Sequence, residues 1–138
     1  MRGVSALAAG LLFVGLGVYG AAAAVPLAYP NAFDSDGRTS NPVALFVMLT
    51  ITEVSALFGG WITARLASDH RIGHAILMAT VGLAFSIAVG AVRWSAAPSW
   101  FYIVSWMLMP GAAALGAAAW ERTLRRTGRD AARRIATS

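Results

Sequence analysis

The chain has 138 residues, of which 58% are hydrophobic and 12% are charged. Because soluble domains carry about 25% charged residues, this composition and a mean hydropathy of +0.65 point to a lipid environment. There is no cysteine, which excludes disulfides, thiolate catalysis, iron–sulfur clusters and cysteine-ligated zinc. The net charge of +5 does not require a nucleic-acid partner, because the arginines follow a topological pattern.

Four apolar runs predict four helices, at about residues 3–25, 43–66, 72–93 and 100–120. Each run is close to the ~20 residues that cross a hydrocarbon core of about 30 Å. Backbone polar groups in lipid must be satisfied within their own segment, so helices are expected. The last three runs are joined by short segments, which makes them up-down neighbours. We therefore predict an all-α membrane protein, with a four-transmembrane-helix bundle in residues 1–121 and a basic tail in residues 122–138.

The first run has a face of small residues, which we expect to pack against another helix. They are Ala6, Gly10, Gly17 and Ala21. With Arg2 before it and four alanines at 21–24, the run is also similar to a signal peptide with a small-residue cleavage site. Because its apolar stretch is long for a signal peptide, we expect the first helix to be retained. The alternative is cleavage, which would leave three helices and the C-terminus still inside.

The first join is rich in turn residues and ends at Asn41-Pro42, a capping side chain followed by a proline at the first helical position. This pair predicts the start of the second helix. Within the join, Asp34-Ser35-Asp36-Gly37 resembles the beginning of a calcium loop, but the later acidic positions and the closing glutamate are missing. We expect a tight turn there, with a calcium site as the alternative.

Glu53 lies in the middle of the second run, twelve residues from Arg65 and near the predicted bilayer midplane. An unpaired acid there costs about 2.5–3.5 kcal/mol, so Glu53 should face the bundle. Ala56, Gly60 and Ala64 follow on the same face, with a spacing that lets another backbone approach closely. Two interpretations remain open. Glu53 is either a proton or cation site, or a neutral carboxyl that hydrogen-bonds a neighbouring helix and fixes its packing.

Pro110 lies in the middle of the fourth run and leaves the Trp106 carbonyl without its helical donor. We expect a neutral Glu53 to donate a hydrogen bond to that carbonyl, or to Ser86 or Ser105. Glu53, Trp106, Pro110 and Ser86 therefore form the candidate intramembrane polar site. The alternative is a plain proline kink without a partner.

Small residues also recur at helical spacing in the third and fourth runs. They are Gly82, Ser86 and Gly90 in the third run, and Ala112 and Gly116 in the fourth. A close-approach face on every helix predicts one tight bundle. Any face left over could serve a homo-oligomer or a larger membrane complex.

His70 and His74 would share one face of a helix, with Asp69 adjacent, but a metal site needs three or four ligands. We expect interfacial histidines, with metal binding as the alternative. The sequence has no recognisable nucleophile–base pair, phosphate loop or cofactor motif. We therefore expect neither an enzyme nor a bound cofactor.

The arginines predict the orientation of the bundle. Nine of the eleven would lie on one side, and Arg38 and Arg93 on the other, so both termini should be cytoplasmic in a bacterial inner membrane. Six of the nine are in the tail, where we expect each to contribute about 1 kcal/mol of attraction to anionic lipid headgroups. These six are Arg122, Arg125, Arg126, Arg129, Arg133 and Arg134. Nucleic acid is not expected as a partner.

A family resemblance covers the chain from Leu57 to Trp94, with the sequence LFGGWITARLASDHRIGHAILMATVGLAFSIAVGAVRW. It resembles a group of small four-helix bacterial membrane proteins that carry Gly-Gly-aromatic-x-x-Ala-Arg-Leu-Ala, a short polar turn and His-Ala before an apolar helix. Pro98, Trp100 and Pro110 look similar too, so the resemblance extends over the later part of the chain. The group has no assigned activity, so the resemblance implies fold and topology only.

Glu53 lies outside the pattern of that group. The small multidrug transporters are a looser comparison, since they are similar in length, in helix number and in having one membrane-embedded glutamate. Their glutamate is in the first helix, whereas Glu53 is in the second predicted helix.

The expected function is that of a small, non-enzymatic integral membrane protein with a structural or accessory role. It would pack with itself or within a larger membrane complex. The alternative is a small proton-coupled transporter that works as a dimer, with Glu53 as the proton carrier. A water-filled cavity around Glu53 would favour transport, and dry packing against glycine and alanine would favour the structural role.

Overall fold

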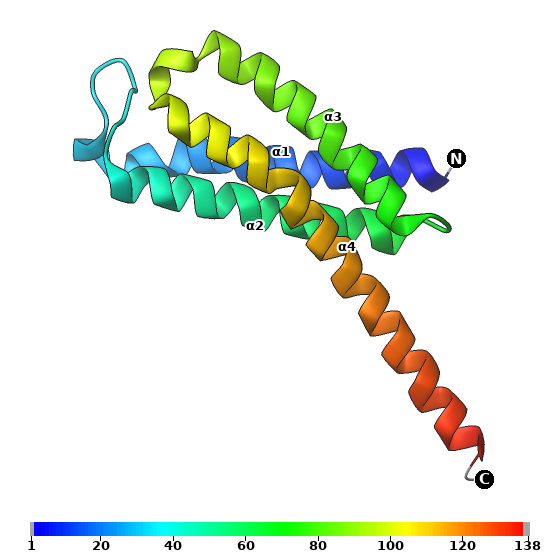
Figure 1. Cartoon of the computed structure of the whole chain (residues 1–138). Helices are drawn as coiled ribbons and strands as arrows, with labels where there is room; N and C mark the ends of the chain where they lie inside the picture. Colours follow the sequence, from blue (N-terminus) through cyan, green and yellow to red (C-terminus); the bar gives the residue numbers. More distant parts are fainter. Residues whose placement is uncertain (1, 137–138) are drawn as a thin grey trace.

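The computed structural model describes residues 2–136 and, within them, the side chains of residues 3–127 and 129. The described chain holds four long helices, α1 (Arg2–Ala28), α2 (Pro42–Leu66), α3 (Arg71–Val92) and α4 (Ser99–Ala136) (Figure 1). Two short 3-10 turns, η1 (Pro30–Ala32) and η2 (Trp94–Ala96), lie in the joins. Each long helix has the length and apolar composition to cross a membrane. The predicted all-helical architecture with four such helices is therefore confirmed.

The helix ends follow the local sequence. The Asn41 side chain accepts hydrogen bonds from the amides of Val43 (3.0 Å) and Ala44 (3.3 Å), with Pro42 at the first helical position. The predicted start of α2 is thus confirmed. α1 runs beyond its predicted end, through Pro26 to Ala28. A proline inside a helix removes one donor, but the last turn of α1 can still close.

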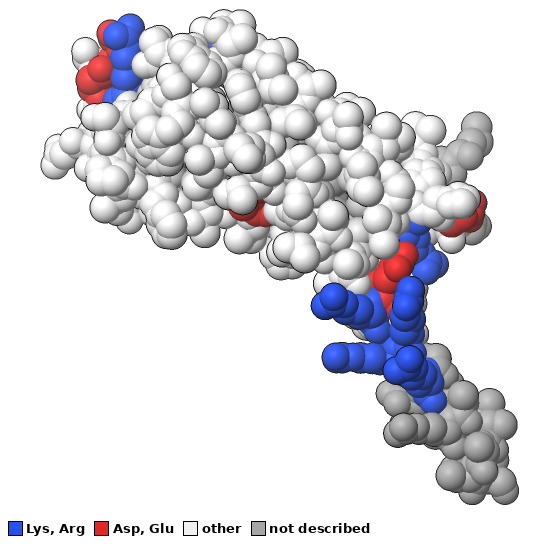
Figure 2. Space-filling model, viewed as in Figure 1, with Lys and Arg blue, Asp and Glu red and all other residues white. Residues whose placement is uncertain are grey.

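α4 is the longest helix and extends well beyond the apolar run that predicted it. It continues without a break to Ala136, because the segment after Trp120 is rich in arginine, alanine and other good helix formers. The basic part projects away from the bundle as one rod (Figure 1). On the face shown in Figure 2, the body is almost free of charge, apart from its two ends and a small acidic patch between them. Arginines gather where α4 leaves the body.

α2 is the central helix and makes the most extensive contacts, with α1 and with α4. α3 lies over α4 and α1 (Figure 1). One core cluster joins all of these helices. Its buried members are Val14 of α1, Ala56 of α2, Met78 and Ala79 of α3, and Met109 and Ala113 of α4.

Two faces of α2 allow backbones to approach closely. Toward α1, a Cβ added at Gly10 would fall on the Thr63 hydroxyl and 2.9 Å from the Gly59 carbonyl oxygen. Likewise, a Cβ at Gly17 would lie 2.6 Å from the Ser55 Cβ. Since real Cβ atoms do not come this close, the α1–α2 contact depends on these glycines.

The α2–α4 contact is at least as tight. A Cβ added at Gly60 would lie 2.8 Å from the Ala113 Cα and even closer to the Ala113 carbonyl group. A Cβ at Gly116 would meet the Leu57 carbonyl group and the Trp61 amide nitrogen at 3.0 Å. Ala56 and Ala64 are fully buried on the same side of α2. Backbone, which cannot rotate away, is the obstacle on both sides of this interface.

The small residues of α3 face side chains of α4, unlike those at the α2–α4 contact, which face backbone. A Cβ at Gly82 would meet Met109 Cε at 2.7 Å, and one at Gly90 would meet Trp106 Cζ2 at 2.8 Å. Large side chains of α4 therefore occupy the space beside this stripe, in place of a neighbouring backbone. Figure 1 shows α3 diverging from α1 toward its Val92 end. This divergence makes room for a cavity.

Candidate functional site

Glu53 faces α4, where the Ser105 hydroxyl lies 3.4 Å from Glu53 Oε1. That separation is long for a hydrogen bond between two oxygen atoms. Glu53 Oε2 is buried and has no hydrogen-bond partner among the described residues. Of the partners considered from the sequence, Ser105 is the one that the structure brings to Glu53, and its hydroxyl donates to the carboxylate, whereas the sequence predicted Glu53 as the donor.

In the described part of the chain, the other members of the candidate polar site form no hydrogen bond with Glu53. The Trp106 indole Nε1 donates to Ser86 Oγ at 3.1 Å, so these two side chains pair with each other across α3 and α4. Pro110 lies inside the continuous α4 helix, which bends near its middle in Figure 1. The structure thus places Glu53 against Ser105, pairs Trp106 with Ser86, and leaves Pro110 outside both contacts.

Within the described chain, a mostly apolar cavity of about 460 Å³ lies between the helices. We call it the α1–α3 cavity, since its rims come from these two helices. Val14 and Val18 of α1, Met48 of α2, and Trp106 and Met109 of α4 are among its apolar lining residues. Ser105 lines it as well, but Glu53 does not. The cavity and the carboxylate therefore lie on different sides of the Ser105 side chain.

The α1–α3 cavity opens sideways, between α1 and α3. Apart from Arg93 at one end, its exposed lining side chains come from these two helices, with Tyr19 at 55% exposure on α1 and Phe85 at 59% on α3. The α4 lining residues Ser105 and Met109 are buried and form the back wall. The opening thus faces the side of the bundle, where lipid would be if the helices span a membrane.

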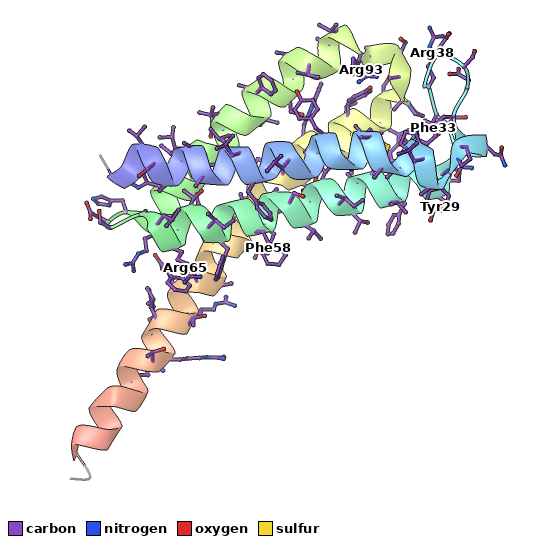
Figure 3. The ribbon with its side chains drawn as sticks, turned by 180° about the vertical axis from the view of Figure 1, so that it is seen from behind. Tyr29, Phe33, Arg38, Phe58, Arg65 and Arg93 are labelled. Carbon is purple, nitrogen blue, oxygen red and sulfur yellow. The ribbon has the colours of Figure 1, made fainter. Side chains whose placement is uncertain are left out.

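The end of the cavity is closed by the join between α1 and α2. The Thr39 amide donates to the Ala96 carbonyl at 3.0 Å, which ties this join to η2. Arg93 lines the cavity at the same end, and Figure 3 shows it with Arg38 and Phe33, at the end opposite Arg65. The Arg93 guanidinium makes no ion pair with any residue whose side chain is described.

In the acidic turn of the same join, the Asp34 carboxylate accepts hydrogen bonds from backbone amides. Asp34 Oδ1 accepts hydrogen bonds from the amides of Asp36 (2.9 Å) and Arg38 (2.8 Å). Gly37 has a φ of 73°, a conformation that glycine adopts without strain. The expected tight turn is therefore confirmed.

The two histidines do not share a helix face, contrary to the prediction from their spacing. His70 lies before α3 with a left-handed φ of 42°, and its carbonyl oxygen is 3.2 Å from His74 Nδ1. The spacing predicts one face only if both residues are helical, but α3 begins at Arg71 and His70 is the residue before it. Among the described residues, no group of three or more His, Cys, Asp or Glu side chains comes together.

An aromatic and basic cluster lies where α4 leaves the bundle. The Arg65 guanidinium carbon is 5.2 Å from the Trp61 ring centroid and 5.5 Å from that of Trp120, and the two rings meet edge to face. Beyond it, Arg122, Arg125, Arg126 and Arg129 are exposed. Arg125 pairs with Glu121 at 3.8 Å. The side chains of Arg133 and Arg134 lie outside the described part of the chain.

Sequence reasoning did not predict the α1–α3 cavity. Its lining residues belong to apolar runs and look like any other lipid-facing or core residue. The sequence contains one weak signal of the cavity, at Gly15, which lies off the predicted packing face of α1. In the structure, a Cβ added at Gly15 would have no atom within 4 Å. No family model matches the chain, and no curated protein or solved structure matches it either. The resemblance over Leu57–Trp94 therefore stays a prediction.

Proposed function

We propose that this chain is a multi-pass integral membrane protein with a structural or accessory role and no enzymatic activity. The observation that carries the proposal is the backbone-level contact of α2 with both α1 and α4, at Gly10, Gly17, Gly60 and Gly116. Contacts between small residues are how helices associate in lipid, where the hydrophobic effect does not drive them together. The outward surfaces of the same helices are apolar and suit lipid, a second copy of the chain, or another membrane subunit.

The proposed orientation has both termini in the cytoplasm of a bacterial cell. Arg65 and the basic part of α4 lie at one end of the bundle, and Arg38 and Arg93 lie at the other (Figure 3). The end with more arginine is the cytoplasmic one by the positive-inside rule. In this orientation α4 would carry its exposed arginines toward anionic headgroups of the inner leaflet.

A proton-coupled transporter that uses Glu53 is the second candidate, favoured by one observation. Glu53 Oε2 is buried without a partner among the described residues, which is the environment of a carboxyl that can exchange a proton. Against it, the α1–α3 cavity stops at Ser105, and Glu53 does not line it. Small residues such as Ala56 flank the carboxylate on α2, which favours a role in packing.

Topology reporters test the proposal. A cytoplasm-active reporter fused after Ser138 should be active, and the same reporter inserted at Gly37 should be silent. Gly37 is a suitable site, since it lies in an exposed turn at the opposite end of the bundle. A fusion after Ser138 that is active only outside the cytoplasm would refute the orientation. Purification in mild detergent followed by native mass spectrometry would then show whether the chain associates with itself or with another subunit.

A further inference from the structure

Several polar side chains in the wall of the α1–α3 cavity are used within the protein, whereas the Tyr19 and Thr52 hydroxyls have no hydrogen bond to a described residue. The Tyr102 hydroxyl donates to the Arg93 carbonyl at 2.7 Å, and the Trp106 indole donates to Ser86. Ser105 is directed at Glu53, and Thr39 donates to the Ala32 carbonyl at 2.7 Å. A polar substrate would therefore find few free hydrogen-bonding groups on this wall. An occupant with an apolar body fits better.

The size and direction of the cavity match one hydrocarbon chain. Its volume of about 460 Å³ lies within the ~300–1,000 Å³ typical of small-ligand sites. Its lining residues on α3 and at the cap that follows it run from Val81 to Arg93, about 18 Å at ~1.5 Å per residue. This is similar to the ~15 Å depth of half a hydrocarbon core. The cavity also lies along the helices and opens sideways between Tyr19 and Phe85, so an acyl chain could enter from the lipid without crossing water.

Arg93 supplies a positive charge at the end of the cavity where a headgroup would lie. The residue is exposed, lines the cavity and makes no ion pair with a described side chain. Arg38 lies at the same end but is within 3.7 Å of the Asp36 carboxylate, and it does not line the cavity. Trp94 and Tyr102 stack 5.4 Å apart beside Arg93, as aromatic side chains do at the level of lipid headgroups. A guanidinium in such a place is suited to bind phosphate oxygens.

We propose that the α1–α3 cavity binds an anionic phospholipid of the outer leaflet, with one acyl chain between α1 and α3 and the phosphate at Arg93. The proposal rests on the membrane location proposed above. It adds a lipid site on the side of the bundle away from the basic part of α4. The bound lipid would fill the space left by the divergence of α3 from α1.

Matched variants test the acyl-chain part. Gly15 and Gly20 both lie on α1 with nothing within 4 Å of an added Cβ, but only Gly15 lines the cavity. The delipidated protein is titrated with phosphatidylglycerol or phosphatidylcholine in detergent, and bound lipid is counted by native mass spectrometry. Gly15→Leu should weaken binding of both lipids at least about tenfold, the loss expected when roughly two buried methylene groups are displaced. Gly20→Leu should bind as the wild type does.

Ala22→Leu, at the exposed rim of the cavity, is a second blocking variant in case Gly15→Leu does not fold. Equal lipid binding by a folded cavity variant and Gly20→Leu would overturn the acyl-chain site. If a cavity variant instead dissociates a dimer and leaves lipid binding unchanged, the occupant is a second copy, and the lipid proposal is refuted. Either result would leave the topology reporters, and the proposed function that they test, unaffected.

The headgroup part is tested by charge. Wild-type protein should bind phosphatidylglycerol about fivefold more tightly than phosphatidylcholine, because one basic residue near an anionic headgroup contributes about that much. Arg93→Gln should remove most of this preference, and Arg38→Gln should keep it. A preference that survives Arg93→Gln, or one lost equally in both variants, would show that Arg93 does not hold the headgroup.

Discussion

Replacement of Gly60 by leucine tests the backbone contact between α2 and α4. The added Cβ would fall on the Ala113 carbonyl group and 2.8 Å from its Cα, so α4 must move away from α2 as a whole. Overpacking against side chains usually costs about 1–3 kcal/mol. Here the obstacle is backbone, which has no rotamer to adopt, so we expect a loss of about 3 kcal/mol or more in the free energy of unfolding. Gly60→Ala should show part of the same loss.

The measurement is equilibrium unfolding in mixed micelles, with Gly20→Leu as the matched control. A Cβ at Gly20 would meet nothing within 4 Å, so this variant should unfold like the wild type or at slightly higher denaturant, since glycine is a poor helix former. The same free energy of unfolding for Gly60→Leu and Gly20→Leu would refute the α2–α4 packing described above. It would also remove the observation on which the proposed structural role depends.

Three further predictions use single side chains. Glu53→Gln should leave the free energy of unfolding nearly unchanged. Glu53→Ala should lower it by about 1–2 kcal/mol, which is the upper range for hydrogen bonds between helices in membranes. Loss of proton-coupled uptake in liposomes that contain the Glu53→Gln variant would instead support transport. Arg65→Gln should cost about 0.5–1 kcal/mol through the lost cation–π contacts, in the same unfolding assay, whereas an unchanged value would mean that they are not stabilising. Asn41→Ala should cost about 1 kcal/mol because α2 loses its cap, and Asn41→Ser should restore most of it; equal stability of the two variants would contradict this.

The apolar runs predicted the helices because lipid and backbone chemistry leave little choice. A stretch of about 20 apolar residues must satisfy its peptide groups internally, and this requirement is local. The cap at Asn41 and the turn at Asp34 were also predictable, since each depends on residues that are close in sequence. The end of α1 was predicted too early. The predicted run ends at residue 25, whereas α1 continues through Pro26 to Ala28, because a proline near a helix end costs only one hydrogen bond.

The partner of each small-residue face could not be predicted. Helical spacing shows that Gly10 and Gly60 belong to close-approach faces, but it does not say that Gly10 meets Thr63 or that Gly60 meets Ala113. Those pairings depend on the crossing of whole helices. For the same reason the sequence suggested several partners for Glu53, and only the packed structure selected Ser105.

The sequence by itself determined the all-helical class, the four helices long and apolar enough to cross a membrane, and the uneven distribution of arginine, because composition and local hydrogen bonding are enough for these. Only the tertiary structure decided that α3 diverges from α1 and that a cavity forms there, with Arg93 at its end. The physical reason is that a cavity is defined by atoms that are absent between elements far apart in the chain. Phe85 has the same local sequence pattern whether it faces lipid, the core or such a space, so its role depends on where α1 lies.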